Sequence, residues 1–231
     1  MNDIKLEFLD FHTHILPSVD HGSDSIETTL SQLSLAKSYG ITKIFATSHF
    51  YPHQHTVSSF IEKRDEAYRK IKEQGIAIPE IKLGAEVLLC EGLYNLEGLE
   101  KLCFLGTKIL LLELPFISLT EGMAHAVISL IENGYEVVLA HADRYPRAKI
   151  EYLITLGVKI QLNVDSIASP FGRKVYFDWF KRGLVVGIGS DIHGVDKKIY
   201  KKFLKAASKI KNYVDDLKQK SEEIWKKALH I

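Results

Sequence analysis

The feature that most constrains the fold of this 231-residue chain is a repeated unit: an amphipathic helix, a glycine, and then a short apolar strand. Apolar residues at helical spacing precede each glycine, and a glycine just past a helix enters the left-handed backbone region without steric cost. The unit recurs around Gly40, Gly75, Gly134, Gly157 and Gly183. Strands that alternate with helices in this way are typical of a parallel sheet.

Seven strands are expected, and several are continuous apolar runs, as in parallel strands that are covered on both faces. They are predicted over residues 6–11, 41–47, 81–85, 109–114, 137–140, 158–162 and 184–188. This arrangement favours an α/β barrel, incomplete or distorted, and an open doubly wound sheet is the alternative. We expect one domain over residues 1–231, with a lysine-rich helical segment from about residue 196.

Two helices also carry recognisable start signals. Asp24 and Glu27 have the spacing of a capping box, and Thr120 is placed to cap a later helix. A capping side chain accepts a hydrogen bond from the first turn of its helix, so these residues predict where two helices begin.

Composition narrows the classes of function. The net charge is +1, so a chain-wide basic surface for nucleic acid is not expected. The longest apolar runs are too short to cross a bilayer, so no membrane insertion is predicted. The two cysteines, Cys90 and Cys103, provide no disulfide framework and are interpreted as buried side chains in a reducing cytoplasm. The oligomeric state is left open.

Imidazoles and carboxylates stand at the carboxyl ends of the expected strands. In a parallel barrel these ends meet on one face, where active sites lie. The residues are His12, His14, Asp20, His49, Glu86, Glu113, His141, Asp191 and His193. The pairs His12/His14 and Asp191/His193 are the strongest signals, because residues i and i+2 of a strand point the same way.

This set of side chains predicts a cluster of divalent metal ions. A single histidine after a strand is more often a hydrogen-bonded core residue, but four carboxylates packed together without metal would repel one another. Mixed nitrogen and oxygen ligands suit manganese, iron or zinc and argue against a structural zinc site. The nine ligands are enough for up to three ions, whose excess positive charge would attract an anion such as phosphate.

Arg144, three residues after His141, is the candidate for a forked contact to phosphate oxygens. The alternative is an ordinary surface arginine that makes no contact with a substrate.

These motifs resemble those of a known family. The segment DFHTHILP at 10–17 resembles the first motif of the PHP (polymerase and histidinol phosphatase) superfamily. The pattern is most similar to the bacterial manganese-dependent tyrosine phosphatases of capsule and exopolysaccharide operons. The similarity continues through VDHG at 19–22, ATSH at 46–49, LLELPF at 111–116, HADR at 141–144 and SDIH at 190–193.

The resemblance implies a distorted seven-stranded barrel of the PHP type with three metal ions, of which manganese is the most typical. One ion would take His12, His14, Glu86 and Asp191; a second would share Glu86 and add Glu113 and His141; the third would take Asp20, His49 and His193. The implied substrate is a phosphotyrosine protein, namely a bacterial tyrosine kinase of capsular or exopolysaccharide synthesis.

The implied mechanism is in-line attack on phosphorus by a hydroxide that bridges the metal ions, while Arg144 holds the phosphate. Asp20 or His193 would help to protonate the leaving oxygen. Neither Cys90 nor Cys103 is followed by an arginine at the spacing that cysteine-based tyrosine phosphatases need, so that mechanism is excluded.

The chain departs from the family pattern near the expected site, although all nine ligand positions are filled. A second acid after Asp20 is replaced by His21, a proline by Ser48, a Pro-Glu pair by Ala142-Asp143, and a later arginine is absent, with Lys197 and Lys198 as the nearest cations. These changes bear on the substrate and leave the metal site intact.

Three alternative functions follow from the same residues: a small-molecule phosphatase such as histidinol phosphatase, a metal-dependent amidohydrolase, and a non-catalytic metal-binding barrel. Glu113 within LELPF favours the tyrosine phosphatases, and it stands where amidohydrolases usually carry a modified lysine. A complete set of ligands weighs against a barrel that has lost catalysis.

Overall fold

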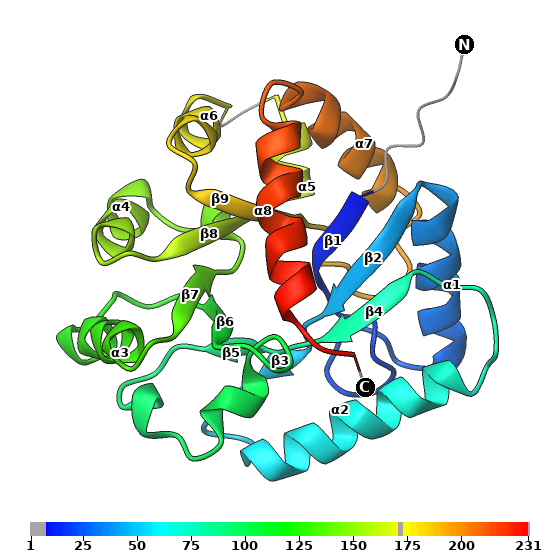
Figure 1. Cartoon of the computed structure of the whole chain (residues 1–231), viewed down its shortest axis with the longest axis horizontal. Helices are drawn as coiled ribbons and strands as arrows, with labels where there is room; N and C mark the ends of the chain where they lie inside the picture. The colour runs from blue at the N-terminus through cyan, green and yellow to red at the C-terminus, as the bar shows by residue number, and fades with distance from the viewer. Residues whose placement is uncertain (1–7, 171–172, 231) are drawn as a thin grey trace.

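The structure is a computed structural model that describes residues 8–170 and 173–230. Every strand pairing in it is parallel, so the expected α/β class is confirmed. The strands form a three-stranded sheet in the order β1-β2-β4 and a six-stranded sheet in the order β3-β5-β6-β7-β8-β9 (Figure 1). A single seven-stranded barrel is therefore not confirmed by the strand pairing.

The strands cover most of the ranges expected from the apolar runs, although residues 6 and 7 of the first range lie outside the described part of the chain. They are β1 (Phe8–Thr13), β2 (Ile41–Ala46), β3 (His49–Phe50), β4 (Glu80–Leu83), β5 (Glu86–Leu88), β6 (Ile109–Glu113), β7 (Glu136–Leu139), β8 (Lys159–Asn163) and β9 (Val185–Gly189).

The helices precede or cover these strands. They are α1 (Ile26–Ser38), α2 (Val57–Lys72), α3 (Glu121–Glu132), α4 (Arg147–Thr155), α5 (Val164–Ala168), α6 (Arg173–Lys181), α7 (Ile199–Lys209) and α8 (Val214–Lys227), with short 3-10 helices η1 (Leu93–Asn95), η2 (Leu99–Leu102) and η3 (Ala142–Arg144). All five glycines of the repeated unit have a positive φ, between 60° and 99°, as predicted. None of the described helices combines the length and apolar composition that crossing a bilayer would require.

The two predicted helix starts have different outcomes. Thr120 caps α3, as expected, and its side chain accepts a hydrogen bond from Met123 N. The prediction for α1 was wrong by one residue: Ser25 is the cap and accepts from Thr28 N, whereas Asp24 accepts from the Thr28 hydroxyl. Adjacent Asp and Ser are both good capping residues, so composition alone could not choose between them.

Two of the seven expected strands are each followed by a further short strand that lies beyond the expected range. After β2 the chain turns aside at Thr47 and Ser48 and continues as β3, and after β4 it turns aside at Gly84 and Ala85 and continues as β5. Strands β2 and β4 pair in the three-stranded sheet, whereas β3 and β5 pair in the six-stranded sheet. Runs of two and three residues are too short for periodicity to reveal, so the sequence did not predict β3 or β5.

Buried apolar side chains pack on both faces of the strands, as parallel strands require. The larger cluster lies mainly between the strands and helices α1 to α7. The smaller one centres on three phenylalanines, Phe11, Phe45 and Phe104, whose ring centroids are 4.1–5.4 Å apart. Trp225 of α8 joins them, with its ring 5.0 Å from that of Phe45.

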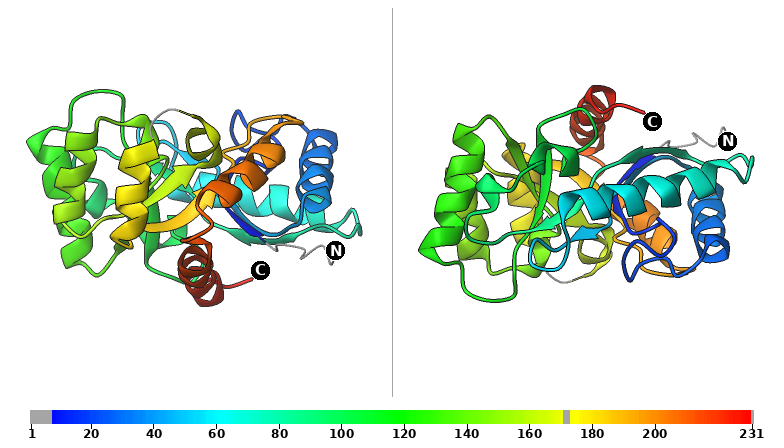
Figure 2. Two further views of the ribbon diagram at one scale, coloured as in Figure 1. Left: turned by 90° about the horizontal axis from the view of Figure 1, so that it is seen from above. Right: turned by 90° about the horizontal axis from the view of Figure 1, so that it is seen from below.

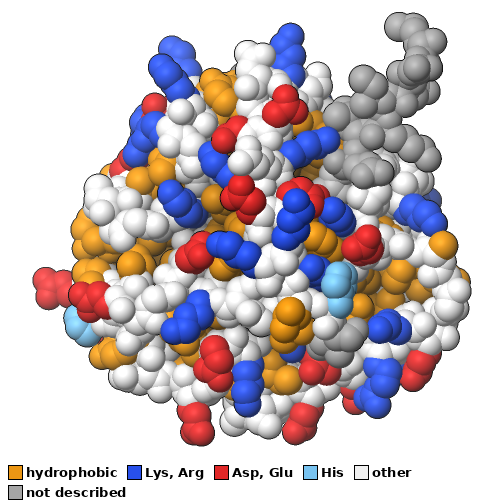
Figure 3. All heavy atoms as spheres, viewed as in Figure 1, with side chains coloured by type: hydrophobic (Ala, Val, Ile, Leu, Met, Phe, Trp, Pro, Cys, Tyr) orange, Lys and Arg blue, Asp and Glu red, His pale blue; other side chains and the backbone are white. Residues whose placement is uncertain are grey.

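Helix α8 covers the strands near their amino ends, opposite to the ends that carry the candidate site. Figure 2 shows α8 standing out on one side of the molecule, and Figure 3 shows side chains of both charges interspersed on that face. The buried Lys82 ammonium of β4 donates to the carbonyls of Trp225 and Ala228, at 2.6 and 2.7 Å, and lies 4.7 Å from the Trp225 ring centroid. A cation at this position compensates the unpaired carbonyls that end the helix.

Replacement of Trp225 by alanine is expected to lower the free energy of unfolding by about 3–5 kcal/mol, because it empties the space beside Phe45. Denaturant unfolding measures this loss. Leu204→Ala on α7, where the side chain is 39% exposed, is the control and should change stability much less. Equal losses in the two variants would show that α8 does not seal this core.

Candidate metal centre

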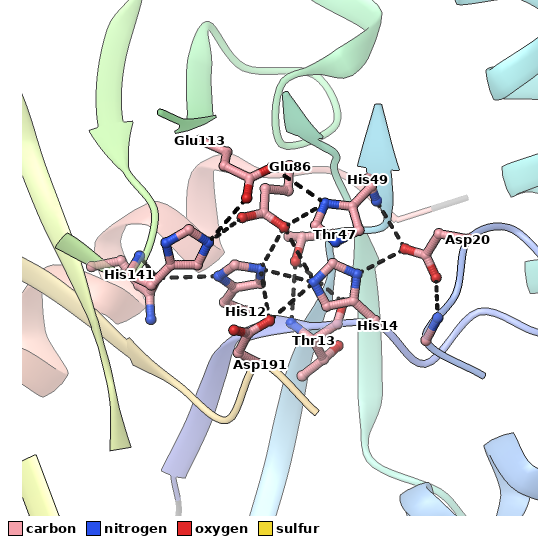
Figure 4. A network of polar contacts seen from close by, with 12 residues as sticks. His12, Thr13, His14, Asp20, Thr47, His49, Glu86, Glu113, His141 and Asp191 are labelled. Carbon is pink, nitrogen blue, oxygen red and sulfur yellow. Dashed lines mark hydrogen bonds and ion pairs between the residues drawn. The ribbon is translucent and has the colours of Figure 1, made fainter. Parts of the chain in front are cut away.

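The nine candidate ligands converge at the carboxyl ends of the strands, and Figure 4 labels all of them except His193. His12 lies in β1, His49 in β3 and Glu86 in β5, and Glu113 is the last residue of β6. The others lie in the connections directly after β1, β7 and β9: His14, Asp20, His141, Asp191 and His193. All nine belong to one network of hydrogen bonds and close nitrogen–oxygen pairs.

Glu86 is at the centre of this network and is fully buried. Its Oε1 atom lies 2.6 Å from His141 Nε2. Its Oε2 atom lies 3.2 Å from the Nε2 atoms of both His12 and His14, and 3.0 Å from His49 Nδ1. One carboxylate therefore faces four imidazoles: His12 and His14 from the end of β1, His49 from β3, and His141 from the connection after β7.

Three overlapping groups of side chains have ligand atoms close enough to share an ion. One is His12, His14 and Glu86; another is His49, Glu86 and Glu113; the last is His14, His49 and His193. The last group differs from the set that the resemblance implied, because it contains His14 where Asp20 was expected, and the second contains His49 where His141 was expected. The first contains His12, His14 and Glu86 as expected, without Asp191.

Asp20 takes a different position because protein donors already surround its carboxylate. Its Oδ2 atom accepts from His14 Nδ1 at 2.7 Å and from His49 N at 2.8 Å, and its Oδ1 atom accepts from Gly22 N. In this structure the Asp20 carboxylate orients the His14 ring and binds the backbone N–H groups of Gly22 and His49. Its carboxylate remains adjacent to the cluster, one hydrogen bond away from His14.

The chemistry of the donor set fits divalent cations. Among the described residues, five buried atoms of the candidate ligands have no hydrogen-bond partner: Glu86 Oε2, Asp191 Oδ1, His49 Nδ1, His141 Nδ1 and His193 Nε2. An unpartnered buried polar atom is costly, and a shared cation would satisfy oxygens and nitrogens together. Ligands of this mixed kind, without thiolate, suit manganese, iron or zinc.

The pKa directions agree with this interpretation. Burial opposes ionisation of Glu86, but His12 and the other imidazoles outweigh it and hold the pKa of the Glu86 carboxyl well below its usual range. Burial likewise opposes protonation of His49, but Glu113 and Glu86 outweigh it and raise the pKa of His49 to about 9. The carboxylates thus favour positive charge at the nitrogens that face them, a condition that a divalent cation also meets.

Backbone strain is concentrated at the same place. Among the described residues other than glycine, three have a positive φ: Ser18 at 59°, His141 at 32° and Asp191 at 51°. Such conformations cost about 1–3 kcal/mol each and persist only when the surroundings impose them. Two of the three belong to the candidate ligand set, so the fold accepts strain to place these side chains.

Two glycines of β9 give the neighbouring strand β1 room to approach. A Cβ atom on Gly187 would lie 2.3 Å from the Phe11 ring, and one on Gly189 would lie 2.6 Å from His12 Cβ. Any side chain at these positions would displace β1. These two glycines allow β1 to lie close to β9. His12 of β1 therefore lies next to Asp191, which directly follows β9.

Arg144 lies at the edge of the network with its side chain 43% exposed. Its guanidinium donates to Asp191 Oδ2, so the arginine that was expected to hold phosphate is paired with a candidate ligand in this structure. Asp191 Oδ2 also accepts from Asn163 Nδ2 at 2.9 Å and so keeps a second partner if the arginine moves. Lys197 and Lys198 are exposed just before α7.

Three residues that sequence reasoning did not assign to the site are part of it. Gln161 and Asn163, on β8, contact His12 and Asp191. The His21 ring stacks 4.7 Å from those of both His49 and His193. A polar residue within the apolar strand KIQLN was the available signal for Gln161, whereas His21 had been noted only as a departure from the family pattern.

Comparison with known proteins places this geometry in context. A family model described as "Capsular polysaccharide synthesis, CpsB/CapC" matches residues 8–226. Tyrosine-protein phosphatase CpsB of Streptococcus pneumoniae is 26% identical over 215 residues, which cover 82% of this chain and 84% of that protein. Tyrosine-protein phosphatase YwqE of Bacillus subtilis is 24% identical over 202 residues, which cover 81% and 78%.

A solved structure shares the fold over nearly the whole chain. It comes from work on "YwqE from Bacillus subtilis and CpsB from Streptococcus pneumoniae, unique metal-dependent tyrosine phosphatases". The TM-score is 0.80 at 21% sequence identity, with 97% of this chain and 96% of that one covered.

Proposed function

Because this chain belongs to the CpsB/CapC family of capsular polysaccharide synthesis, we propose that it is a metal-dependent phosphatase that hydrolyses phosphotyrosine in proteins. The observation that carries the proposal is the Glu86 centre, where one buried carboxylate faces four imidazoles and leaves an oxygen without a hydrogen-bond partner. The relatives support the substrate class.

We infer that the nine candidate ligands would hold three divalent ions, with manganese as the first candidate, and that Glu86 would contribute to two of the sites. His12, His14 and Asp191 would complete the first site, and Glu113 with His141 the second. His49 and His193 would form the third with Asp20, whose present hydrogen bonds to His14 and to backbone would then rearrange. Iron or zinc would suit the same donors.

We propose that the two sheets are parts of one distorted seven-stranded barrel, since backbone hydrogen bonds such as Gly84 N to Ala46 O bridge the interruptions and Asp191 N donates to His12 O between β9 and β1. We further propose a single domain in the cytoplasm, whose protein substrate is a bacterial tyrosine kinase of capsule or exopolysaccharide synthesis.

Each component of the site has a distinct chemical part. When bound, the divalent cations would supply a water molecule of lowered pKa and neutralise charge on the phosphoryl oxygens. Arg144 would release Asp191 and place its planar fork on the phosphate. Asp20 and His193 remain the two candidates for protonating the leaving oxygen, but three donors occupy Asp20. His193 Nδ1 lies 3.0 Å from the Asp191 carbonyl and its Nε2 atom would bind the third ion, so His193 would carry no proton to give while that ion is bound.

A substrate panel on the manganese-loaded protein tests the proposed function. Phosphotyrosine peptide should give the highest kcat/KM, above phosphoserine peptide and histidinol phosphate. Faster turnover of histidinol phosphate would identify a small-molecule phosphatase instead. No turnover of any phosphomonoester, with the metals bound, would favour a non-catalytic metal-binding barrel.

Arg144→Ala is expected to lower kcat/KM for phosphotyrosine peptide by roughly 10- to 100-fold while the metal content stays unchanged, since one charge-assisted contact to phosphate is lost. Metal should stay bound because Asn163 still holds Asp191. Arg144→Lys should restore only part of the activity, because an ammonium lacks the planar fork. Loss of metal in Arg144→Ala would instead show that the arginine acts through Asp191.

An apolar rim beside the site supports an aromatic substrate. Phe116 is 83% exposed and Ile117 is 60% exposed in the loop that follows Glu113. The Phe116 ring lies 6.5 Å from that of Tyr145, which in turn lies 5.7 Å from the His141 ring. These rings lead from the candidate metal ligands to solvent, where the ring of a phosphotyrosine can pack against Phe116.

Phe116→Ala is therefore expected to raise KM for phosphotyrosine peptide by about two- to tenfold, as expected for one aromatic contact, and to leave turnover of phosphoserine peptide unchanged. Ile76→Ala, which removes a 47% exposed side chain between α2 and β4, is the control. An equal effect on both peptides would mean that Phe116 does not select for the aromatic ring.

A further inference from the structure

Strand β8 contributes none of the nine candidate ligands, yet its carboxyl end carries two buried amides, Gln161 and Asn163. Gln161 lies between His141, which follows β7, and His12 of β1. Asn163 lies next to Asp191. Every hydrogen-bonding contact that these two side chains make can be assigned a direction, because backbone groups fix the ends of the network.

The orientation of the Gln161 amide is determined by two backbone groups. His141 N, which can only donate, lies 2.7 Å from Gln161 Oε1. The carbonyl of Leu162, which can only accept, lies 2.8 Å from Gln161 Nε2. The reverse orientation of the amide would place donor against donor and acceptor against acceptor.

This orientation in turn fixes the tautomer of His12. Gln161 Oε1 also lies 3.1 Å from His12 Nδ1, and an oxygen that only accepts requires the hydrogen to be on that nitrogen. When the ring is neutral, its Nε2 atom keeps the lone pair, and Nε2 is the atom that lies 3.2 Å from Glu86 Oε2. A histidine held in this way presents its lone pair to a metal ion.

The second arm of the network reaches Asp191. Gln161 Nε2 donates to Asn163 Oδ1 at 3.0 Å, so Asn163 must present its NH₂ group to Asp191 Oδ2, at 2.9 Å. With Oδ2 held, Asp191 Oδ1 is left to face His14 Nε2 at 3.2 Å. One glutamine thus orients two candidate ligands that are 179 positions apart in the sequence.

We propose that Gln161 is a positioning residue that sets the affinity of the first metal site by fixing His12 directly and Asp191 through Asn163. The inference rests on the proposed function, in which these two residues bind a divalent cation. Hydrogen-bond partners of metal ligands typically change metal affinity by about 10- to 100-fold when they are lost, because they fix the tautomer and orientation of the ligand.

The test measures Mn²⁺ binding to the metal-free protein by electron paramagnetic resonance, alongside the melting temperature. Gln161→Leu keeps the approximate volume of the side chain but removes its hydrogen bonds to His12 and Asn163. It should weaken binding of the most tightly bound Mn²⁺ ion by about 10- to 100-fold. Asn163→Ala, which breaks only the arm to Asp191, should weaken it less. Should Gln161→Leu fail to fold, Asn163→Ala carries the test alone.

The matched control is Leu162→Ala on the same strand, whose buried side chain packs in the apolar core. It should lower the melting temperature while Mn²⁺ affinity stays at the wild-type value. Wild-type affinity in Gln161→Leu or in a folded Asn163→Ala, or an equal loss of affinity in Leu162→Ala, would overturn the positioning role. Absence of Mn²⁺ binding by the wild-type protein would instead refute the proposed metal site.

Discussion

Replacement of Glu86 by glutamine should remove metal from two sites at once and reduce phosphotyrosine turnover more than any other single change of a ligand. The substitution keeps the shape of the side chain but removes its charge and turns one oxygen into a donor. Because Glu86 is buried among four imidazoles, no solvent can replace the lost charge. Removal of one partner of a buried ion pair typically costs about 3–5 kcal/mol. A loss of that size in metal binding would lower the affinity by roughly two to four orders of magnitude.

Elemental analysis of the purified variant measures this effect directly. The Glu86→Gln protein should contain clearly less manganese than the wild type and should need a much higher Mn²⁺ concentration for any activity. Glu91→Gln is the matched control, because Glu91 follows the same strand but is exposed and contacts Thr120 instead. Full metal occupancy in Glu86→Gln would show that Glu86 does not bridge two ions.

The sequence was sufficient to predict where the candidate ligands gather, because the helix–glycine–strand unit places the carboxyl ends of all the strands on the same side. His12 and His14 illustrate this: their alternation after an apolar run places both side chains near Glu86, and the structure has both Nε2 atoms 3.2 Å from its Oε2. The parallel direction of the strands followed from the same pattern.

The sequence could not predict how the strands divide between sheets. At one of the two interruptions Phe104 occupies the space beside Gly84, where a Cβ atom would lie 2.9 Å from its ring. Such a contact between distant segments leaves no periodic trace. The correction matters for the site, because it places His49 and Glu86 within paired strands, directly opposite each other.

The motifs also could not identify residues that position the candidate ligands through hydrogen bonds. Gln161 has no charge and no characteristic spacing from the ligands, and its role is visible only when β8 lies between His141 and His12. Likewise, Asp20 was expected as a ligand, but its oxygens accept hydrogen bonds from His14 and from backbone in this structure. The chemistry of a side chain shows whether it can be a metal ligand. Which residues hold the ligands in place depends on how the strands pack and cannot be predicted from residue type.

Removal of metal should abolish phosphotyrosine hydrolysis, whereas blockage of the cysteines should not. Divalent cations contribute several kcal/mol to such a reaction, so the loss should be about three orders of magnitude or more. The cysteines, in contrast, show no sign of an activated thiolate: burial raises the pKa of the Cys103 thiol to about 12 and raises that of Cys90 as well. A thiol with a raised pKa is a poor nucleophile near neutral pH.

The decisive measurement is therefore kcat/KM for a phosphotyrosine peptide on three preparations of the wild-type protein: untreated, stripped with a chelator and desalted, and alkylated with iodoacetamide. Circular dichroism confirms that each preparation remains folded. A metal-dependent phosphatase predicts near-complete loss in the stripped protein, recovery when Mn²⁺ is added back, and full activity after alkylation. Activity that survives metal removal but is lost on alkylation would contradict the proposed function.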